Sequence, residues 1–212
     1  MSNTFNSEDL QILSQLGNAL GPIFLRDPKD NQDVVRLMRG LKEYAQANTP
    51  WPYIDDEDSL ARYFSQLSSW SGELEKGLYD DYRRLFVGPG HIPAPPYVSA
   101  YTDPDLVMFG KTCLELKDWL KRNGIVMHSE NMPEDHLGRL LMLMAWLTEH
   151  KPEILEEFLE EHFLPLGDYI FEKIEAEAHH PVYISISGIA KETLRGIVKT
   201  YDLHPRHLRS YR

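Results

Sequence analysis

The sequence predicts an all-α protein, a single compact multi-helix domain of about eight or more helices over residues 1–212. Apolar side chains recur every three to four residues through most of the chain, which is the spacing of an amphipathic helix. No series of segments shows the alternating pattern of β-strands, and there is no internal repeat. With 42% hydrophobic residues, the chain can bury a substantial core.

Two helices are expected before residue 48. Ser7 is a suitable N-cap for the first helix, and Gly21 with Pro22 should end or interrupt it. The second helix is expected at about residues 31–47, where apolar residues keep the helical period. The prolines in residues 49–52 cannot continue it and mark a connection.

The third and fourth helices should lead into a proline-rich loop. The third is expected to present Leu60, Tyr63, Phe64, Leu67 and Trp70. The fourth, with Ser71 as its N-cap, is expected to present Leu74, Leu78, Tyr82, Leu85 and Phe86. The glycines on either side of Pro89 should end the helix, and prolines favour extended backbone in residues 88–103. This loop is the best candidate for a subdomain hinge, although its aromatic residues favour an ordered loop.

The helix after this loop should begin at Asp103, an N-cap followed by a first-turn proline, and end at Gly124. Its expected apolar residues are Val107, Leu114, Leu116, Trp119 and Leu120. Asn131 with Glu134 resembles a capping box, which would begin a long helix ending near residue 150. Three prolines divide the rest into three more helical segments: Pro152, Pro165 and Pro181.

A short stretch with two acidic residues and a histidine opens the long helix. If Glu134 and Asp135 lie in its first turn, they interact favourably with the helix dipole, and Asp135 pairs with Arg139. These structural roles explain the carboxylates as well as the alternative does, in which they receive a guanidinium group. For His136, the sequence favours a structural histidine over a pH-sensitive contact or an acid–base role.

The sequence holds no recognisable catalytic or metal-binding motif, so we expect neither an enzyme nor a bound metal or cofactor. A di-iron bundle needs two Glu-x-x-His pairs, and only Glu177 with His180 fits. Paired cysteines, a His-Glu-x-x-His pattern and a nucleophile elbow are all absent. The single cysteine, Cys113, lies in an apolar helical pattern that favours a buried, inert thiol.

The charge distribution favours cationic partners. A formal net charge of −11 argues against a nucleic-acid surface and would speed encounter with a cationic peptide. A run of glutamates in residues 149–161 is expected to form a solvated helix face, and the basic residues 204–212 a loosely held terminus. Without a leader pattern or a run long enough to cross a membrane, the expected location is the cytoplasm, with no stable membrane insertion.

Three motifs in a fixed order carry a family resemblance. They are residues 85–90, the proline-rich residues 93–101 and the acidic helix entrance at 133–136. Together they resemble the TorD/DmsD/NarJ family of redox-enzyme maturation chaperones, most of all its DmsD and TorD branches. The resemblance implies an all-helical cytoplasmic chaperone. It would bind the twin-arginine signal peptide of a molybdopterin-dependent reductase, for dimethyl sulfoxide or trimethylamine N-oxide, and hold the precursor until its cofactor is inserted.

The resemblance also implies where the peptide binds. Asp135 and His136 occupy positions implicated in leader binding, and Tyr97 and Tyr101 match positions that are often aromatic. The predicted peptide-binding residues are Glu134, Asp135, His136, Leu85, Phe86, Gly88, Pro89, Tyr97 and Tyr101. DmsD-like members often carry Trp in place of Gly90 and Tyr97, which leaves the identity of the client reductase open.

Two other function classes stay open beside this one. One is a helical metal- or nucleotide-dependent hydrolase that uses Asp135, His136, His179 and His180. The other is an adaptor that binds a folded partner without reading its leader. The resemblance is compatible with a monomer or with a domain-swapped dimer. Guanine nucleotide and molybdopterin, suggested as ligands for some members, receive no independent support from these residues.

Overall fold

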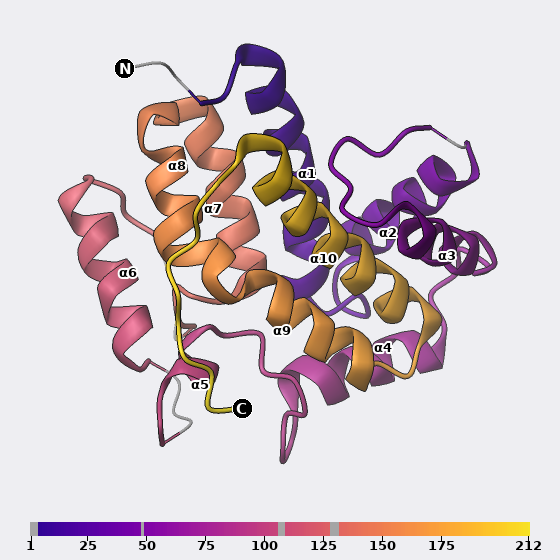
Figure 1. Cartoon of the computed structure of the whole chain (residues 1–212). Coiled ribbons are helices and arrows are strands. Elements are labelled where there is room, and N and C mark those ends of the chain that lie inside the picture. Colours follow the sequence, from indigo (N-terminus) through magenta and orange to yellow (C-terminus); the bar gives the residue numbers. More distant parts are fainter. Residues whose placement is uncertain (1–3, 48, 106–108, 128–131) are drawn as a thin grey trace.

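The computed structural model describes residues 4–47, 49–105, 109–127 and 132–212, and there it confirms the all-α prediction (Figure 1). The α-helices are α1 (Ser7–Leu25), α2 (Gln32–Gln46), α3 (Glu57–Ser68), α4 (Lys76–Tyr82), α5 (Ser99–Thr102), α6 (Lys111–Arg122), α7 (Leu137–His150), α8 (Leu155–Phe158), α9 (Leu164–Glu177) and α10 (Pro181–Tyr201). Two π-helical turns, η1 (Arg83–Val87) and η3 (Leu159–Phe163), and a 3-10 turn, η2 (Pro152–Ile154), extend or join them. No helix in these ranges is both long enough and apolar enough to cross a membrane.

Helices α1 and α7 pack against each other at very close range (Figure 1). Glycines on both helices make this possible. A methyl group on Gly17 would collide with the carbonyl oxygen of Leu141, and one on Gly21 would lie 2.8 Å from the carbonyl oxygen of Gly138. Because protein interiors have few voids, this contact leaves no room for larger side chains. The interface places the start of α7, and with it His136, beside the end of α1.

Helix α10 lies between α3 and α9 and is buried on most of its faces. Gly188 brings the ring of Tyr63 from α3 against the α10 backbone. On the α9 side, Lys191 donates to Glu175 over 2.6 Å. These contacts hold α10 in the core, and Asp81 fixes the α9–α10 turn beside α4 by accepting the backbone N–H groups of His179 and His180.

The structure corrects two expectations at the N-terminus. The N-cap of α1 is Asn6 rather than Ser7, and Asn6 shares a capping box with Asp9. Pro22 does not end α1, which continues to Leu25. Because Ile23 and Phe24 beyond the proline are completely buried, their packing outweighs the backbone hydrogen bond that a proline removes.

Two further helix starts are also wrong. Helix α4 begins after Glu75, because Gly72 bends the chain with φ 86° and Ser71 Oγ accepts the Glu73 N–H in a turn. Helix α6 begins after Gly110, and Asp103 instead ends α5 and accepts the Asp105 N–H. The expected core residues Leu74 and Leu114 are exposed, while Val107 lies outside the described residues.

The long helix α7 begins later than the sequence predicts. Its N-cap is His136, so Glu134 and Asp135 precede the helix and do not lie in its first turn. Asn131, the expected partner in a capping box, lies outside the described residues. The capping role therefore passes from the carboxylates to the histidine.

The basic residues 204–212 are held firmly, which corrects the expectation of a loose terminus. Figure 1 shows this segment running from the end of α10 past α9 toward α5. The Arg206 guanidinium donates to Glu115 on α6 over 2.8 Å, and the Tyr211 N–H donates to the Tyr101 carbonyl over 2.8 Å. Arg212 donates to the Ile92 carbonyl over 3.0 Å. The segment thus fastens α6 and the proline-rich loop to the helical core.

Candidate functional site

Helix α4 continues into the π-helical turn η1, which carries Leu85 and Phe86. In this turn the Gly88 N–H donates to the Arg83 carbonyl over 2.8 Å. Gly88 has φ 90° and ψ −164°, a conformation essentially restricted to glycine. Leu85 and Phe86 are buried, whereas Val87 is exposed. Single π-turns occur frequently at functional sites, because they change the direction of the side chains around them.

The proline-rich loop returns to the segment that precedes α7. Tyr97 and His136 form an isolated antiparallel bridge. On one side of it the Val98 N–H donates to the Asp135 carbonyl over 3.2 Å, and on the other the Leu137 N–H donates to the Pro96 carbonyl over 2.8 Å. Backbone hydrogen bonds thus join two of the sequence motifs, and η1 brings the third to the same place.

Asp135 is buried and supports this bridge from inside. Its Oδ2 accepts the Ser99 N–H over 2.6 Å at the start of α5. Burial raises the pKa of Asp135, while the hydrogen bond from Ser99 lowers it. The Cys113 thiol lies nearby, and burial raises its pKa to about 12, so it is protonated at neutral pH. Through its hydrogen bond from Ser99, Asp135 holds the proline-rich loop in place.

Glu134 lies against α6. Its Oε2 lies 3.2 Å from the Lys117 ammonium, and the Cys113 thiol donates to the same oxygen over 3.7 Å. Glu134 lines a pocket of about 330 Å³ at the end of α6, together with Lys117 and Gly124. The two neighbouring carboxylates thus have different partners: Asp135 accepts from Ser99 in the loop, and Glu134 pairs with Lys117 on α6.

His136 is neutral in the folded protein. Burial, and to a smaller extent the nearby Arg139, lowers its pKa to about 3. Its Nδ1 accepts the Gly138 N–H over 3.0 Å, so the ring proton resides on Nε2. Among the described residues Nε2 makes no hydrogen bond, and His136 lines a pocket. His136 consequently offers one N–H donor.

A pocket of about 550 Å³ lies where η1, the bridge and the end of α1 meet, and we call it the η1 pocket. Its apolar wall consists of Leu25, Tyr82, Phe86, Val87, Tyr97 and Met132. Asp27 and Asp30, from the turn between α1 and α2, supply its acidic end. Arg83 occupies that end: its Nε donates to Asp27 over 2.7 Å, and its Nη2 lies 3.6 Å from Asp30. Gly88 and His136 complete the lining.

The structure gathers part of the predicted site around this pocket. Four predicted residues line it: Phe86, Gly88, Tyr97 and His136. Five do not: Leu85 lies in the core, Pro89 is exposed on the loop, Tyr101 is buried beneath the C-terminal segment, and Glu134 and Asp135 face elsewhere. The sequence reasoning missed Asp27, Asp30 and Arg83. The only available signal was the acidic turn after Gly21 and Pro22, and nothing in it marks a pairing with Arg83.

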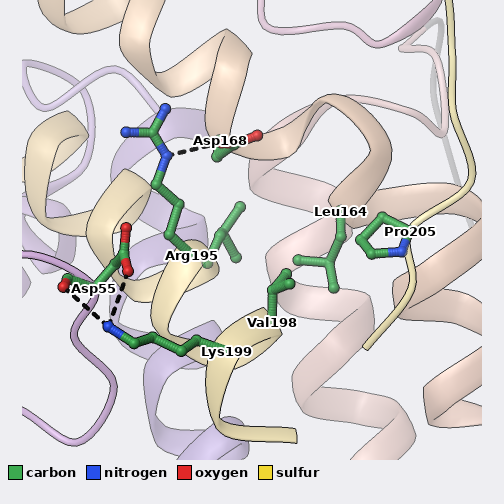
Figure 2. A pocket seen from close by; sticks show the side chains of 8 residues that line it. Asp55, Leu164, Asp168, Arg195, Val198, Lys199 and Pro205 are labelled. Carbon is green, nitrogen blue, oxygen red and sulfur yellow. Dashed lines mark hydrogen bonds and ion pairs between the residues drawn. The ribbon is translucent and has the colours of Figure 1, made fainter. Parts of the chain in front are cut away.

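Two other pockets contain none of the predicted residues. One, of about 390 Å³, lies between α9, α10 and the C-terminal segment; it is lined by Arg195, which pairs with Asp168 at 2.9 Å, and by Lys199, which pairs with Asp55 at 3.2 Å (Figure 2). The other, of about 490 Å³, is mainly apolar and lies between α1, α2 and residues 50–52.

The residues of the hydrolase alternative serve separate structural roles. The backbone N–H groups of His179 and His180 donate to Asp81 over 2.8 and 2.7 Å, and the His180 ring lies 3.2 Å from Glu75. Asp135 and His136 are engaged at the bridge. Within the described ranges, no group of three or more His, Cys, Asp or Glu is arranged to hold a metal ion.

Comparisons with known proteins agree with one another. A family model described as nitrate reductase delta subunit matches residues 28–170. The "Probable Tat proofreading chaperone DmsD" of Haemophilus influenzae is 32% identical over 189 residues, which cover 88% of this chain and 90% of the relative. The Tat proofreading chaperone DmsD of Salmonella typhimurium is 31% identical over 92% of this chain and 91% of its own length. Chaperone protein YcdY of Escherichia coli is 29% identical over 85% of this chain and 91% of its own.

Proposed function

Because this chain belongs to the TorD/DmsD/NarJ family of redox-enzyme maturation chaperones, we propose that it binds the twin-arginine signal peptide of a molybdopterin-dependent reductase in the cytoplasm. It is a maturation chaperone and not a catalytic enzyme, as the family and its relatives indicate. The client is a reductase of the dimethyl sulfoxide or trimethylamine N-oxide type. The chaperone holds its precursor until the cofactor is inserted, which prevents premature export.

The η1 pocket is the observation that supports this proposal. A twin-arginine leader combines two guanidinium groups with an apolar stretch, so its receptor needs carboxylates beside an accessible apolar wall. The pocket sets Asp27 and Asp30 next to Phe86, Val87 and Tyr97. The His136 Nε2–H adds a donor for a carbonyl of the bound peptide. The apolar stretch then lies along the exposed side of Val87.

The roles of the two predicted carboxylates follow from their positions. Asp135 does not line the pocket, so we assign it the support of the Tyr97–His136 bridge. Glu134 pairs with Lys117, so we assign it the attachment of the α7 entrance to α6. A net charge of −11 strengthens long-range attraction of a cationic leader, and salt screens it.

Calorimetry with synthetic leader peptides tests the proposal. A peptide with two arginines should bind, and binding should weaken as salt rises and when both arginines become lysines, because lysine cannot form the bidentate contact. Equal binding of both peptides at all salt concentrations would contradict the charge-pairing mechanism.

A precursor without its leader distinguishes the adaptor alternative. If the chaperone reads the leader, a pull-down with the truncated precursor should recover much less chaperone than one with the complete precursor. Equal recovery would instead favour an adaptor that binds the folded part of its partner.

A further inference from the structure

We propose that Arg83 is an internal competitor for the η1 pocket, a guanidinium that occupies the acidic end until an arginine of the client displaces it. This inference rests on the proposed function and specifies how the same pocket is regulated. It implies that the chaperone contains a positively charged residue whose removal strengthens binding of a positively charged ligand.

The geometry of Arg83 is that of a replaceable occupant. Its Nε donates to Asp27 Oδ2 over 2.7 Å, but the closest approach to Asp30 is 3.6 Å, beyond hydrogen-bonding distance. Arg83 therefore does not form the two parallel hydrogen bonds of a bidentate contact with either carboxylate. An incoming guanidinium can form that contact with Asp27 or Asp30 once Arg83 has moved.

The solvent exposures of the three side chains indicate that Arg83 can leave the pocket toward solvent when a client arginine enters. Asp27 is sheltered, with 15% of its side chain exposed, whereas Arg83 is 42% and Asp30 73% exposed. The leaving guanidinium can thus swing into water, where it is rehydrated. Partly exposed ion pairs contribute little net stability, because solvation competes with the charge attraction. Displacing Arg83 consequently costs little.

His136 independently indicates that this pocket receives a ligand. It is only 3% exposed, it lines the pocket, and its Nε2–H has no hydrogen-bond partner in the part of the chain that the structure describes. This N–H is a free donor in the pocket lining, and a bound peptide carbonyl would accept its hydrogen bond. The pocket thus offers carboxylates for a side chain, a donor for a main chain and an apolar wall.

The chain contains a matched control in Arg195 (Figure 2). Arg195 also bridges two carboxylates, Asp168 at 2.9 Å and Glu172 at 2.8 Å, and is 35% exposed. It lies twelve residues beyond Tyr183, the α10 residue that packs on Phe86, which is about 18 Å along the helix. Arg83→Gln and Arg195→Gln therefore remove the same charge from similar surroundings at two places.

Calorimetry with the twin-arginine peptide and its twin-lysine counterpart compares these variants in the full chain. Arg83→Gln should tighten binding of the arginine peptide by about three- to fivefold, the range expected for removing a partly exposed ion pair. Arg195→Gln should leave the affinity unchanged. Arg83→Lys, which keeps the charge but loses the planar fork, should fall between wild type and Arg83→Gln. Asp27→Asn should weaken binding.

The outcomes separate this inference from the proposed function. Wild-type protein that binds no leader overturns both. Leader binding that Arg83→Gln leaves unchanged or weakens, with the variant shown to be folded by its melting curve, overturns the competitor role alone. Equal tightening in Arg195→Gln also overturns it, because the effect would then come from net charge.

Discussion

Tyr97 and His136 face each other across the antiparallel bridge, with ring centroids 5.0 Å apart at an interplanar angle of 82°. The two residues belong to different sequence motifs, so this edge-to-face contact packs the proline-rich loop against the start of α7. The tyrosine ring also covers one part of the imidazole. Burial of that kind is the main reason for the lowered pKa of His136.

The neutral His136 predicts a pH dependence of stability. Its pKa is about 3 when folded and about 6.5 when unfolded, so the unfolded chain binds the extra proton between these values. Its contribution to stability is present above pH 6.5 and is lost as the pH falls toward 3. Between pH 7 and pH 5, the free energy of unfolding should drop by about 2 kcal/mol on account of this residue.

Denaturant titrations of wild type and His136→Asn at several pH values measure this effect. Asparagine keeps an N-cap acceptor, so the helix should remain intact. The raised pKa of Asp135 acts in the opposite direction, and His162, whose pKa is lowered to about 4, acts in the same direction. Both contributions cancel in the comparison. Parallel pH profiles for the two proteins would contradict a neutral His136.

Asp135 should matter more for its hydrogen bond than for its charge. Asp135→Ala leaves the buried Ser99 N–H without an acceptor and should cost about 1–3 kcal/mol in the free energy of unfolding. Asp135→Asn keeps an acceptor oxygen and should cost less. If Asn proves as damaging as Ala in thermal melts, the charge itself is required.

Gly88 should resist substitution because of its backbone conformation. Alanine at φ 90° and ψ −164° is strained, so Gly88→Ala should lower the free energy of unfolding by about 1–3 kcal/mol. Gly90 offers a comparison, since it also has a positive φ, 106°, but nothing lies within 4 Å of an added methyl group. Gly90→Ala therefore measures the backbone strain without a steric contact. Chemical denaturation of Gly88→Ala with an unchanged midpoint would contradict the strain.

Replacing a glycine by alanine should have opposite effects on stability at the α1–α7 interface and on an exposed helix surface. Gly17→Ala collides with the Leu141 carbonyl and should destabilise the protein by about 1–3 kcal/mol. Gly40→Ala, in the exposed middle of α2 with nothing within 4 Å, should stabilise it by about 0.5–1 kcal/mol. Thermal melts of both variants give the comparison. Stabilisation by both would mean that the helices can separate without cost.

Local sequence patterns predict the helices well, because apolar spacing is a property of neighbouring residues. Helix α2 is capped by Asn31 and Ala47, at the ends that the pattern predicts. Predictions of helix ends near loops fail where the same residue type can stabilise either a helix start or a turn. Asp103 can cap a helix N-terminus or stabilise a turn, and in this protein it ends α5 and stabilises a turn.

The candidate site is only partly predictable for a different reason. Tyr97 and His136 lie in recognisable motifs, and the backbone bridge brings them to one pocket. The acidic end depends on Asp27 meeting Arg83 across a large sequence separation. No local periodicity encodes that meeting, since it follows from how α1, α2 and α4 pack.

The α1–α7 pairing has a consequence for synthesis of the protein. Helix α1 leaves the ribosome before α7, and its glycine-lined face has no partner until α7 has been translated, on the order of ten seconds later at ordinary elongation rates. Helix α2 can cover part of α1 earlier, but the face that packs on α7 remains open to water or to other proteins during that interval. This maturation chaperone thus passes through a period of its own synthesis in which the α7-facing side of α1 is uncovered.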